Sequence, residues 1–163
     1  MRDNSGLNQA DMAAWFSTIN TPDFFMKKFG VLPLLDPKLK ECCYDKKELT
    51  LSFQVKEWEL NPEGGLHGGM IVTGFDMTFG LLCHYFQKPN MVCTVNLFTT
   101  FIKPVLPGDT VDYQVRIISH GKKIVSMTGE ARVQRENILA ATATTTFMIL
   151  DKGAGTLERD RPL

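Results

Sequence analysis

The chain has 163 residues, about the length of one ordinary domain, and 44% of them are apolar while 22% are charged. This composition is typical of a soluble globular domain and excludes a long disordered chain. The basic and acidic residues balance at 18 each, which excludes a general electrostatic attraction to nucleic acid or to an anionic membrane surface. An anionic ligand must therefore be bound by local groups.

The cysteines and the apolar stretches indicate a cytoplasmic location. The four cysteines form no CxxC pair, and the adjacent Cys42 and Cys43 are a poor start for a disulfide framework. Residues 1–9 lack the basic stretch and apolar core of a signal peptide. The apolar run at 70–86 contains an aspartate, a histidine and two glycines, so it is a poor membrane span. We expect a cytoplasmic protein with reduced thiols that binds neither nucleic acid nor a membrane.

Short helices followed by strands are predicted in the first third of the chain. Residues 11–18 and 22–29 have helical patterns, and Thr21-Pro22 supplies a cap and a first-turn proline. From residue 39 the pattern changes, with one strand predicted over about 39–44. Apolar and polar residues then alternate through 51–55, which is typical of a strand with one buried face.

The run from His67 to Phe86 predicts a long helix. Apolar residues lie on every side of it at helical spacing, and a helix that is apolar all round is a buried helix. Gly74 and Gly80 each cost about 1 kcal/mol relative to alanine inside a helix, so we expect another backbone to pack very close to them. A sheet wrapped around the helix would do this.

The rest of the chain is predicted as strands and turns. The four expected strands cover residues 91–103, 111–117, 124–134 and 138–150. With two strands before the helix and four after it, the simplest packing is an α+β fold in which a curved antiparallel sheet surrounds a central helix. We divide the chain into N-terminal accessory helices (1–38), one domain (39–150) and a polar tail (151–163).

Asp76 is the first candidate for chemistry. It is the only charged residue between Leu66 and Lys88, in the middle of a helix that is otherwise predicted to be buried. A lone buried carboxylate is costly, and the cost is usually tolerated where a function needs it. The alternative is that Asp76 points to solvent or caps a neighbouring loop, and the helix pattern leaves both open.

His67-Gly68-Gly69 stands where the loop becomes the helix. The first N–H groups of a helix lack internal partners and can hold an anion or a developing oxyanion. Alternatively, the glycines only permit a tight turn and close packing. His67 is either a general base or a neutral imidazole that fixes the loop.

The spacing of Gly68 and Asp76 predicts a dimer if both are catalytic. Eight residues of helix span roughly 12 Å, too far for both groups to reach one carbonyl. The amide must then come from one subunit and the carboxylate from another, which requires a symmetric dimer with two equivalent sites.

Several spaced elements together carry a resemblance to a known family. They are, in order, Asn61, His67-Gly68-Gly69, Asp76, Thr94 and Phe101-Ile102-Lys103-Pro104. Over about residues 45–150 the chain resembles the hotdog-fold acyl-CoA thioesterases of the phenylacetic-acid-pathway type.

The resemblance implies a role for each matching residue. The Gly68 amide would polarise the thioester carbonyl, while Asp76 of the opposite subunit would attack or activate water. Asn61 and Thr94 match positions that help place the thioester or the water, and His67 completes the catalytic set. Thr94 stands where the family often has serine, although either hydroxyl can donate and accept.

The resemblance also implies where coenzyme A (CoA) binds. The hairpin at Gly121, Lys122 and Lys123 matches a part of the family that lies near the CoA phosphates, and lysines can supply that charge. Lys103 is a second cation of this kind, and Gly69 completes the predicted substrate-binding set. For Lys122 and Lys123 the alternative is a solvated hairpin tip.

Other chemistries find no support in the sequence. Three scattered histidines without a cysteine pair give no zinc ligand set, and no GxSxG nucleophile motif occurs. We expect no metal and no cofactor. Two rivals are kept: a non-catalytic acyl-CoA-binding regulator of the same fold, and an enoyl-CoA hydratase. The hydratase pattern has its histidine after the aspartate, whereas here His67 precedes Asp76.

The sequence thus predicts a hydrolase that converts an acyl-CoA thioester to CoA and a carboxylic acid. It would work as a homodimer or as a tetramer made of two dimers. The acyl pocket is expected at the dimer interface, with Met70, Phe75, Phe79 and Leu82 as candidates to line it. Aromatic and aliphatic acyl groups are both compatible with this lining.

Overall fold

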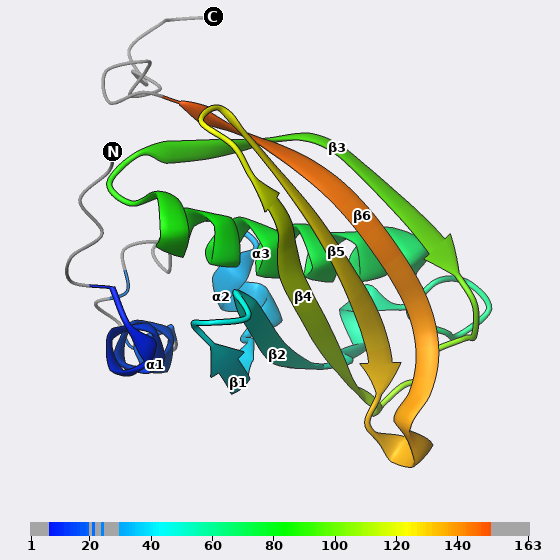
Figure 1. Cartoon of the computed structure of the whole chain (residues 1–163). Coiled ribbons are helices and arrows are strands. Elements are labelled where there is room, and N and C mark those ends of the chain that lie inside the picture. The colour runs from blue at the N-terminus through cyan, green and yellow to red at the C-terminus, as the bar shows by residue number, and fades with distance from the viewer. Residues whose placement is uncertain (1–6, 20, 22–23, 25–29, 151–163) are drawn as a thin grey trace, which may run out of the picture.

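The computed structural model describes residues 7–19, 21, 24 and 30–150. In this part of the chain a six-stranded antiparallel sheet curves around one long helix (Figure 1). The strands are β1 (Lys38–Cys43), β2 (Glu48–Gln54), β3 (Met91–Phe101), β4 (Thr110–His120), β5 (Ile124–Val133) and β6 (Ile138–Leu150). The α-helices are α1 (Gln9–Ser17), α2 (Leu32–Leu35) and the long α3 (Gly68–Gln87), with two 3-10 turns, η1 (Glu57–Glu59) and η2 (Arg135–Asn137). The predicted α+β arrangement is confirmed.

The N-terminal helices are tested only in part. α1 confirms the helix predicted at 11–18, and the Asn8 side chain caps it by accepting the amide N–H groups of Ala10 and Asp11. The helix predicted at 22–29 lies almost wholly outside the described residues. The four-residue α2 is not among the predicted elements, since it is too short for a periodic pattern.

The strand order places β1 and β3 at the two edges of the sheet. The order is β1-β2-β4-β5-β6-β3, and every pairing is antiparallel. β3 pairs with β6 from Met91↔Leu150 to Phe101↔Ala141, with an irregularity between Thr94 and Asn96. The other side of β3 is paired with no strand in the described chain, so it presents free backbone groups.

The core lies between α3 and the concave face of the sheet. Fully buried side chains of α3, such as Phe75, Phe79 and Leu82, pack there with inward residues of the strands. The prediction that α3 is buried all round is wrong in one respect. A stripe of α3 is not fully buried, and it consists of Gly69, Val72, Thr73, Asp76, Met77, Gly80 and His84.

The two glycines inside α3 pack differently. A Cβ added at Gly74 would lie 2.4 Å from Cζ of Tyr113, so this glycine is needed for the Tyr113 ring on β4 to reach the helix. At Gly80 the nearest atom to an added Cβ is Cε1 of Phe147, at 3.8 Å, an ordinary contact. The prediction that another backbone packs very close is therefore wrong for both glycines: a side-chain ring approaches Gly74 closely, and Gly80 has only an ordinary side-chain contact.

Candidate active site

The start of α3 is built by His67. Its backbone N–H donates to the Glu59 carbonyl at 2.9 Å, and its Nδ1 accepts the Gly69 N–H at 2.9 Å. His67 is thus the N-cap of α3. Because Nδ1 accepts, the neutral ring carries its proton on Nε2, which matches the interpretation of His67 as a neutral imidazole that fixes the loop.

Gly68 offers an unused amide at the helix N-terminus. Among the described residues its N–H has no hydrogen-bond partner. A Cβ at Gly68 would lie 3.3 Å from Cζ of Phe101, the last residue of β3, so the glycine also permits close packing. Close packing is therefore observed at Gly68, and anion binding by its N–H stays a prediction.

An open pocket of about 330 Å³ adjoins Gly68. Its lining residues are Asn61, Gly65, Leu66, Gly68, Ile71, Phe101, Ile102, Lys103, Pro104 and Val105. The Asn61 side chain closes the 61–65 loop, because its Oδ1 accepts the Gly65 N–H at 3.0 Å. The structure thus brings together three residues that the sequence singles out: Asn61, Gly68 and Lys103.

Asp76 lies on the open stripe of α3, two turns beyond Gly68. Its carboxylate is half-buried and Oδ1 accepts a hydrogen bond from Thr94 Oγ1 on β3 at 2.8 Å. The hydroxyl therefore orients the carboxylate from the neighbouring strand. Asp76 and Thr94, predicted separately, form one pair, and the alternative in which Asp76 caps a loop is wrong.

Within one chain these groups form two separate half-sites. Gly68 and Asp76 are in the same helix, so about 12 Å of helix axis separates them. The first half-site contains Asn61, Gly68 and Lys103, and the second contains Asp76 and Thr94. No single carbonyl group can contact both of them in one chain.

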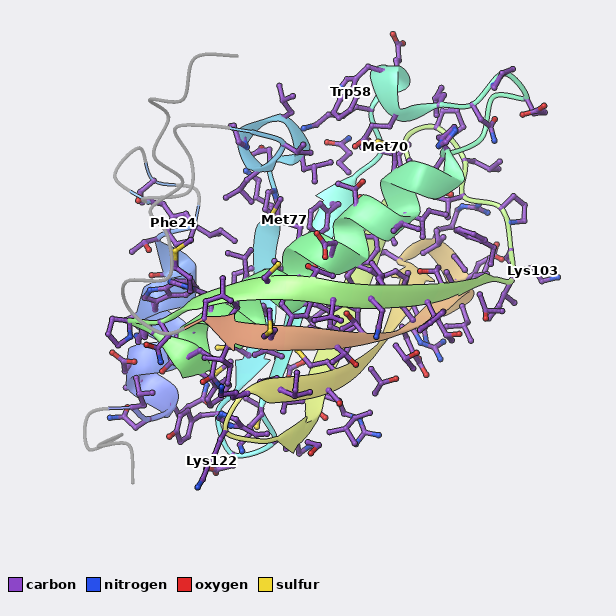
Figure 2. All side chains as sticks on the ribbon, turned by 90° about the horizontal axis from the view of Figure 1, so that it is seen from above. Phe24, Trp58, Met70, Met77, Lys103 and Lys122 are labelled. Carbon is purple, nitrogen blue, oxygen red and sulfur yellow. The ribbon has the colours of Figure 1, made fainter. Side chains whose placement is uncertain are left out.

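The predicted lysines are also far apart. Figure 2 places Lys103, beyond the end of β3, and Lys122, in the β4–β5 hairpin, at opposite ends of the molecule. Gly121, Lys122 and Lys123 are all exposed. One protomer therefore does not gather its predicted cations around the Gly68 pocket.

Glu59 is a buried acid that the sequence analysis missed. It is 5% exposed, and its Oε2 accepts the Lys56 N–H at 2.7 Å within η1. The Glu59 carbonyl also accepts the His67 N–H, so η1 fixes the position of the first residues of α3. Burial raises the pKa of the nearby Tyr113, and the charge of Glu59 adds to the increase. A residue in a three-residue 3-10 turn gives no periodic signal that could reveal this burial.

The predicted acyl-pocket lining needs correction. Phe75, Phe79 and Leu82 are fully buried in the core, because they face the sheet, and none of them lines the pocket at Gly68. Met70 is half-buried at the first turn of α3. The apolar walls of the pocket come instead from Leu66 and Ile71 and from the segment that follows β3.

Other candidate groups find no site in the described part of the chain. Its residues contain no group of three or more His, Cys, Asp or Glu side chains able to hold a metal. Burial raises the pKa of the Cys83 thiol to about 12, so this cysteine is not an activated nucleophile. No helix among the described residues is long and apolar enough to cross a membrane.

Comparison with known proteins extends these observations. Residues 63–140 match the model of the thioesterase superfamily. A proposed esterase of Pseudomonas aeruginosa is 26% identical over 132 residues, which cover 79% of this chain and 97% of that protein. The 3-hydroxyacyl-[acyl-carrier-protein] dehydratase FabZ of Methylobacterium nodulans is 35% identical over 82 residues. That match covers 47% of this chain and only half (50%) of the dehydratase.

Solved structures show the same fold. The PaaI protein of the E. coli phenylacetic acid degradation operon aligns with a TM-score of 0.69 and 16% identity, covering 77% of this chain and 87% of that one. A hypothetical thioesterase of Streptococcus pneumoniae, solved with coenzyme A, aligns at 0.63 with 18% identity, covering 69% of this chain and 87% of its own. The predicted hotdog fold is confirmed, and so is the resemblance to hotdog thioesterases.

Proposed function

From a hotdog fold whose residues 63–140 match the thioesterase superfamily, we propose that the protein hydrolyses an acyl-CoA thioester to CoA and a carboxylic acid. The observation that carries the proposal is the Thr94–Asp76 pair on the open stripe of α3. The half-buried Asp76 carboxylate accepts a hydrogen bond from Thr94 Oγ1 at 2.8 Å, which orients it. The esterase name of the Pseudomonas relative and the CoA in the Streptococcus structure support it.

The complete site would form in a dimer joined through β3. This edge strand has free backbone groups and exposed apolar side chains, including Val95 and Phe98 at 55% and 68% exposure. Antiparallel pairing of two copies about the centre of β3 sets the end of one β3 beside the start of the other. Because Gly68 packs at Phe101 and Asp76 at Thr94, this pairing moves each Gly68 toward Asp76 of the partner subunit.

In this site the residues divide the chemistry between them. The Gly68 N–H donates to the thioester oxygen and stabilises the negative charge that develops on it. Asp76 of the partner subunit either takes a proton from the attacking water or attacks the carbonyl itself, giving an anhydride that water then hydrolyses. Collapse of the tetrahedral intermediate breaks the C–S bond, and the CoA thiolate leaves and takes up a proton. Asn61 and Thr94 hold the groups in place.

The same symmetry gives the hairpin lysines a role in trans. The β4–β5 hairpin lies at the Met91 end of β3, since Ile124 pairs with Met148 and Met148 with Cys93. In the dimer that end adjoins the Phe101 end of the partner. Lys122 and Lys123 would then face the CoA phosphates of a substrate bound at the partner's Gly68, with Lys103 closer to the thioester.

Turnover of a panel of aromatic and aliphatic acyl-CoAs, followed by free-thiol release, tests the proposal. We expect hydrolysis by the native protein and a loss of at least a hundredfold in Asp76→Asn, because positioned acid–base catalysis contributes about 10²–10⁴ in rate. CoA binding and dimerisation should be kept. Full activity in Asp76→Asn would refute the mechanism, and binding without turnover would favour the acyl-CoA-binding regulator.

A dehydratase or hydratase is the second candidate, because the Methylobacterium relative is a dehydratase. Such chemistry needs a histidine near the acid. Within one chain His67 and His84 flank Asp76 at opposite ends of α3. The proposed dimer brings His67 toward the partner's Asp76, but there its Nδ1 is already used to accept the Gly69 N–H as the helix N-cap. We therefore favour hydrolysis. An enoyl-CoA in the same panel, monitored for loss of its conjugated absorbance, separates the two reactions. A tetramer and the cytoplasmic location remain predictions.

A further inference from the structure

Gln87, the last residue of α3, is a buried polar side chain that the proposed mechanism does not use. It is 1% exposed. Its Nε2 lies within hydrogen-bond distance of Nε2 of His120, at 2.5 Å. With the neutral His120 ring accepting at Nε2, the Gln87 amide donates to it. A buried amide is costly to leave unpaired, and this contact connects the His120 ring to the end of α3.

His120 is the last residue of β4 and leads directly into the hairpin. The turn itself is closed by the Gly121 N–H, which donates to the Ile124 carbonyl at 2.9 Å. The Lys123 carbonyl accepts the Ile149 N–H of β6 at 2.8 Å. The hairpin is therefore held to the sheet by its backbone, and the Gln87 contact adds a connection to the central helix.

We propose that Gln87 is a positioning residue for CoA binding: through His120 it holds the hairpin that carries Lys122 and Lys123. The inference rests on the proposed function, in which these lysines contact CoA phosphates. α3 then contributes to binding at both ends of the substrate. It carries Asp76 on its open stripe, and at its C-terminal end it carries Gln87, whose contact with His120 we call the hairpin brace. A flexible lysine side chain binds a phosphate better when its backbone is fixed, because less conformational freedom is lost on binding.

The variant Gln87→Leu tests the brace, because it removes the amide and keeps a similar volume. Affinity for CoA is measured by calorimetry at low and high salt, together with KM and kcat for a hydrolysed acyl-CoA. We expect Gln87→Leu to weaken CoA binding and raise KM roughly fivefold, the size expected for one hydrogen bond, with kcat kept. The salt dependence of binding should fall as it does in Lys122→Ala.

A double mutant separates positioning from a merely structural role. If Gln87 acts through the hairpin, adding Gln87→Leu to a variant that carries both Lys122→Ala and Lys123→Ala should not weaken CoA binding further. Thr78→Val is the matched control: Thr78 is fully buried in α3 and bonds the Gly74 carbonyl at 2.8 Å, away from the hairpin. This control can lower the melting temperature but should leave CoA affinity unchanged.

His120 is exposed, so replacing it gives a second variant that does not disturb the core. His120→Ala should reproduce the effect of Gln87→Leu on KM. Unchanged CoA affinity in both variants, or effects that add to those of the variant lacking both lysines, would overturn the inference. If Lys122→Ala still weakens CoA binding in that case, the proposed function stands and only the role of Gln87 is refuted. If the native protein binds no CoA, both the proposed function and this inference fail.

Discussion

Thr94 and Asp76 show what a single hydrogen bond can do at the residue scale. The sequence predicts each of them through a family pattern, but it does not predict that they bond to each other within one chain. Thr94 and Asp76 are 18 positions apart in the chain, and their contact depends on β3 lying beside α3. A hydrogen bond from a hydroxyl to a carboxylate is directional, so it limits the orientations that the Asp76 side chain adopts.

Thr94→Val removes this hydroxyl and keeps the shape of the side chain. We expect kcat to fall about tenfold or more, because the Asp76 carboxylate loses the donor that orients it. The measurement is steady-state hydrolysis of the best substrate of the panel. Thr94→Ser is the matched control and should retain most activity. If Thr94→Val is as active as Thr94→Ser, the hydroxyl does not orient the carboxylate.

Glu59 and Gln87 mark the limit of sequence reasoning at this scale. Both are polar, and both are almost fully buried, at 5% and 1% exposure. One comes from a short turn and the other from the end of a helix, where polar residues are usually solvated. Their burial is set by distant contacts, with the start of α3 for Glu59 and with His120 for Gln87. Local patterns carry no information on such contacts.

At the scale of elements, the sequence predicts α3 and all six strands close to their observed bounds. Hydrophobic periodicity is a strong signal for long elements, and α3 has 20 residues. It does not predict that one stripe of α3 stays open. An apolar residue has the same hydropathy whether it faces the core or a surface free to pair with another chain. The sequence therefore predicts Phe75, Phe79 and Leu82 as pocket residues, although they belong to the core.

The glycines of α3 give a prediction at this scale. Gly74→Ala should destabilise the fold by about 1–3 kcal/mol, because its Cβ would overlap the Tyr113 ring, which packs between α3 and β4. Gly80→Ala should be neutral or stabilise by up to about 1 kcal/mol, since the helix propensity improves without a clash. Thermal unfolding checks both, with roughly 2–4 °C expected per kcal/mol. Equal shifts in the two variants would contradict the packing difference.

At the scale of the whole molecule, the separation of the two half-sites is the reason for proposing a site shared between two chains. The sequence predicts this from the spacing of Gly68 and Asp76 alone, since a helix fixes their separation. It does not predict the edge through which two chains would join. The strand order leaves β1 and β3 as the edges of the sheet in the described chain, and β3 is the edge that carries Thr94 and Phe101, next to both half-sites. Strand order depends on pairings between distant segments that a single sequence does not encode locally.

Gly68→Pro is a suitable variant for removing one half-site. Proline lacks the amide N–H and is tolerated at the first position of a helix. His67 already has the extended backbone, φ −60° and ψ 134°, that a following proline requires. The lost N–H has no partner among the described residues, so little stability should be lost. The Cβ of the proline would lie 3.3 Å from Cζ of Phe101, a contact that a shift of a few tenths of an ångström relieves.

Mixed dimers then test whether the site is shared between chains. A heterodimer of a Gly68→Pro chain and an Asp76→Asn chain, purified through two different tags, has one site with both lesions and one with none. We expect about half the wild-type turnover, although each parent homodimer is inactive. The mirror-image control pairs a wild-type chain with a chain that carries both substitutions. In that dimer each shared site has one lesion, so no activity is expected. A site contained within one chain would give the reverse result, since the control would then keep one intact site and the first heterodimer would keep none.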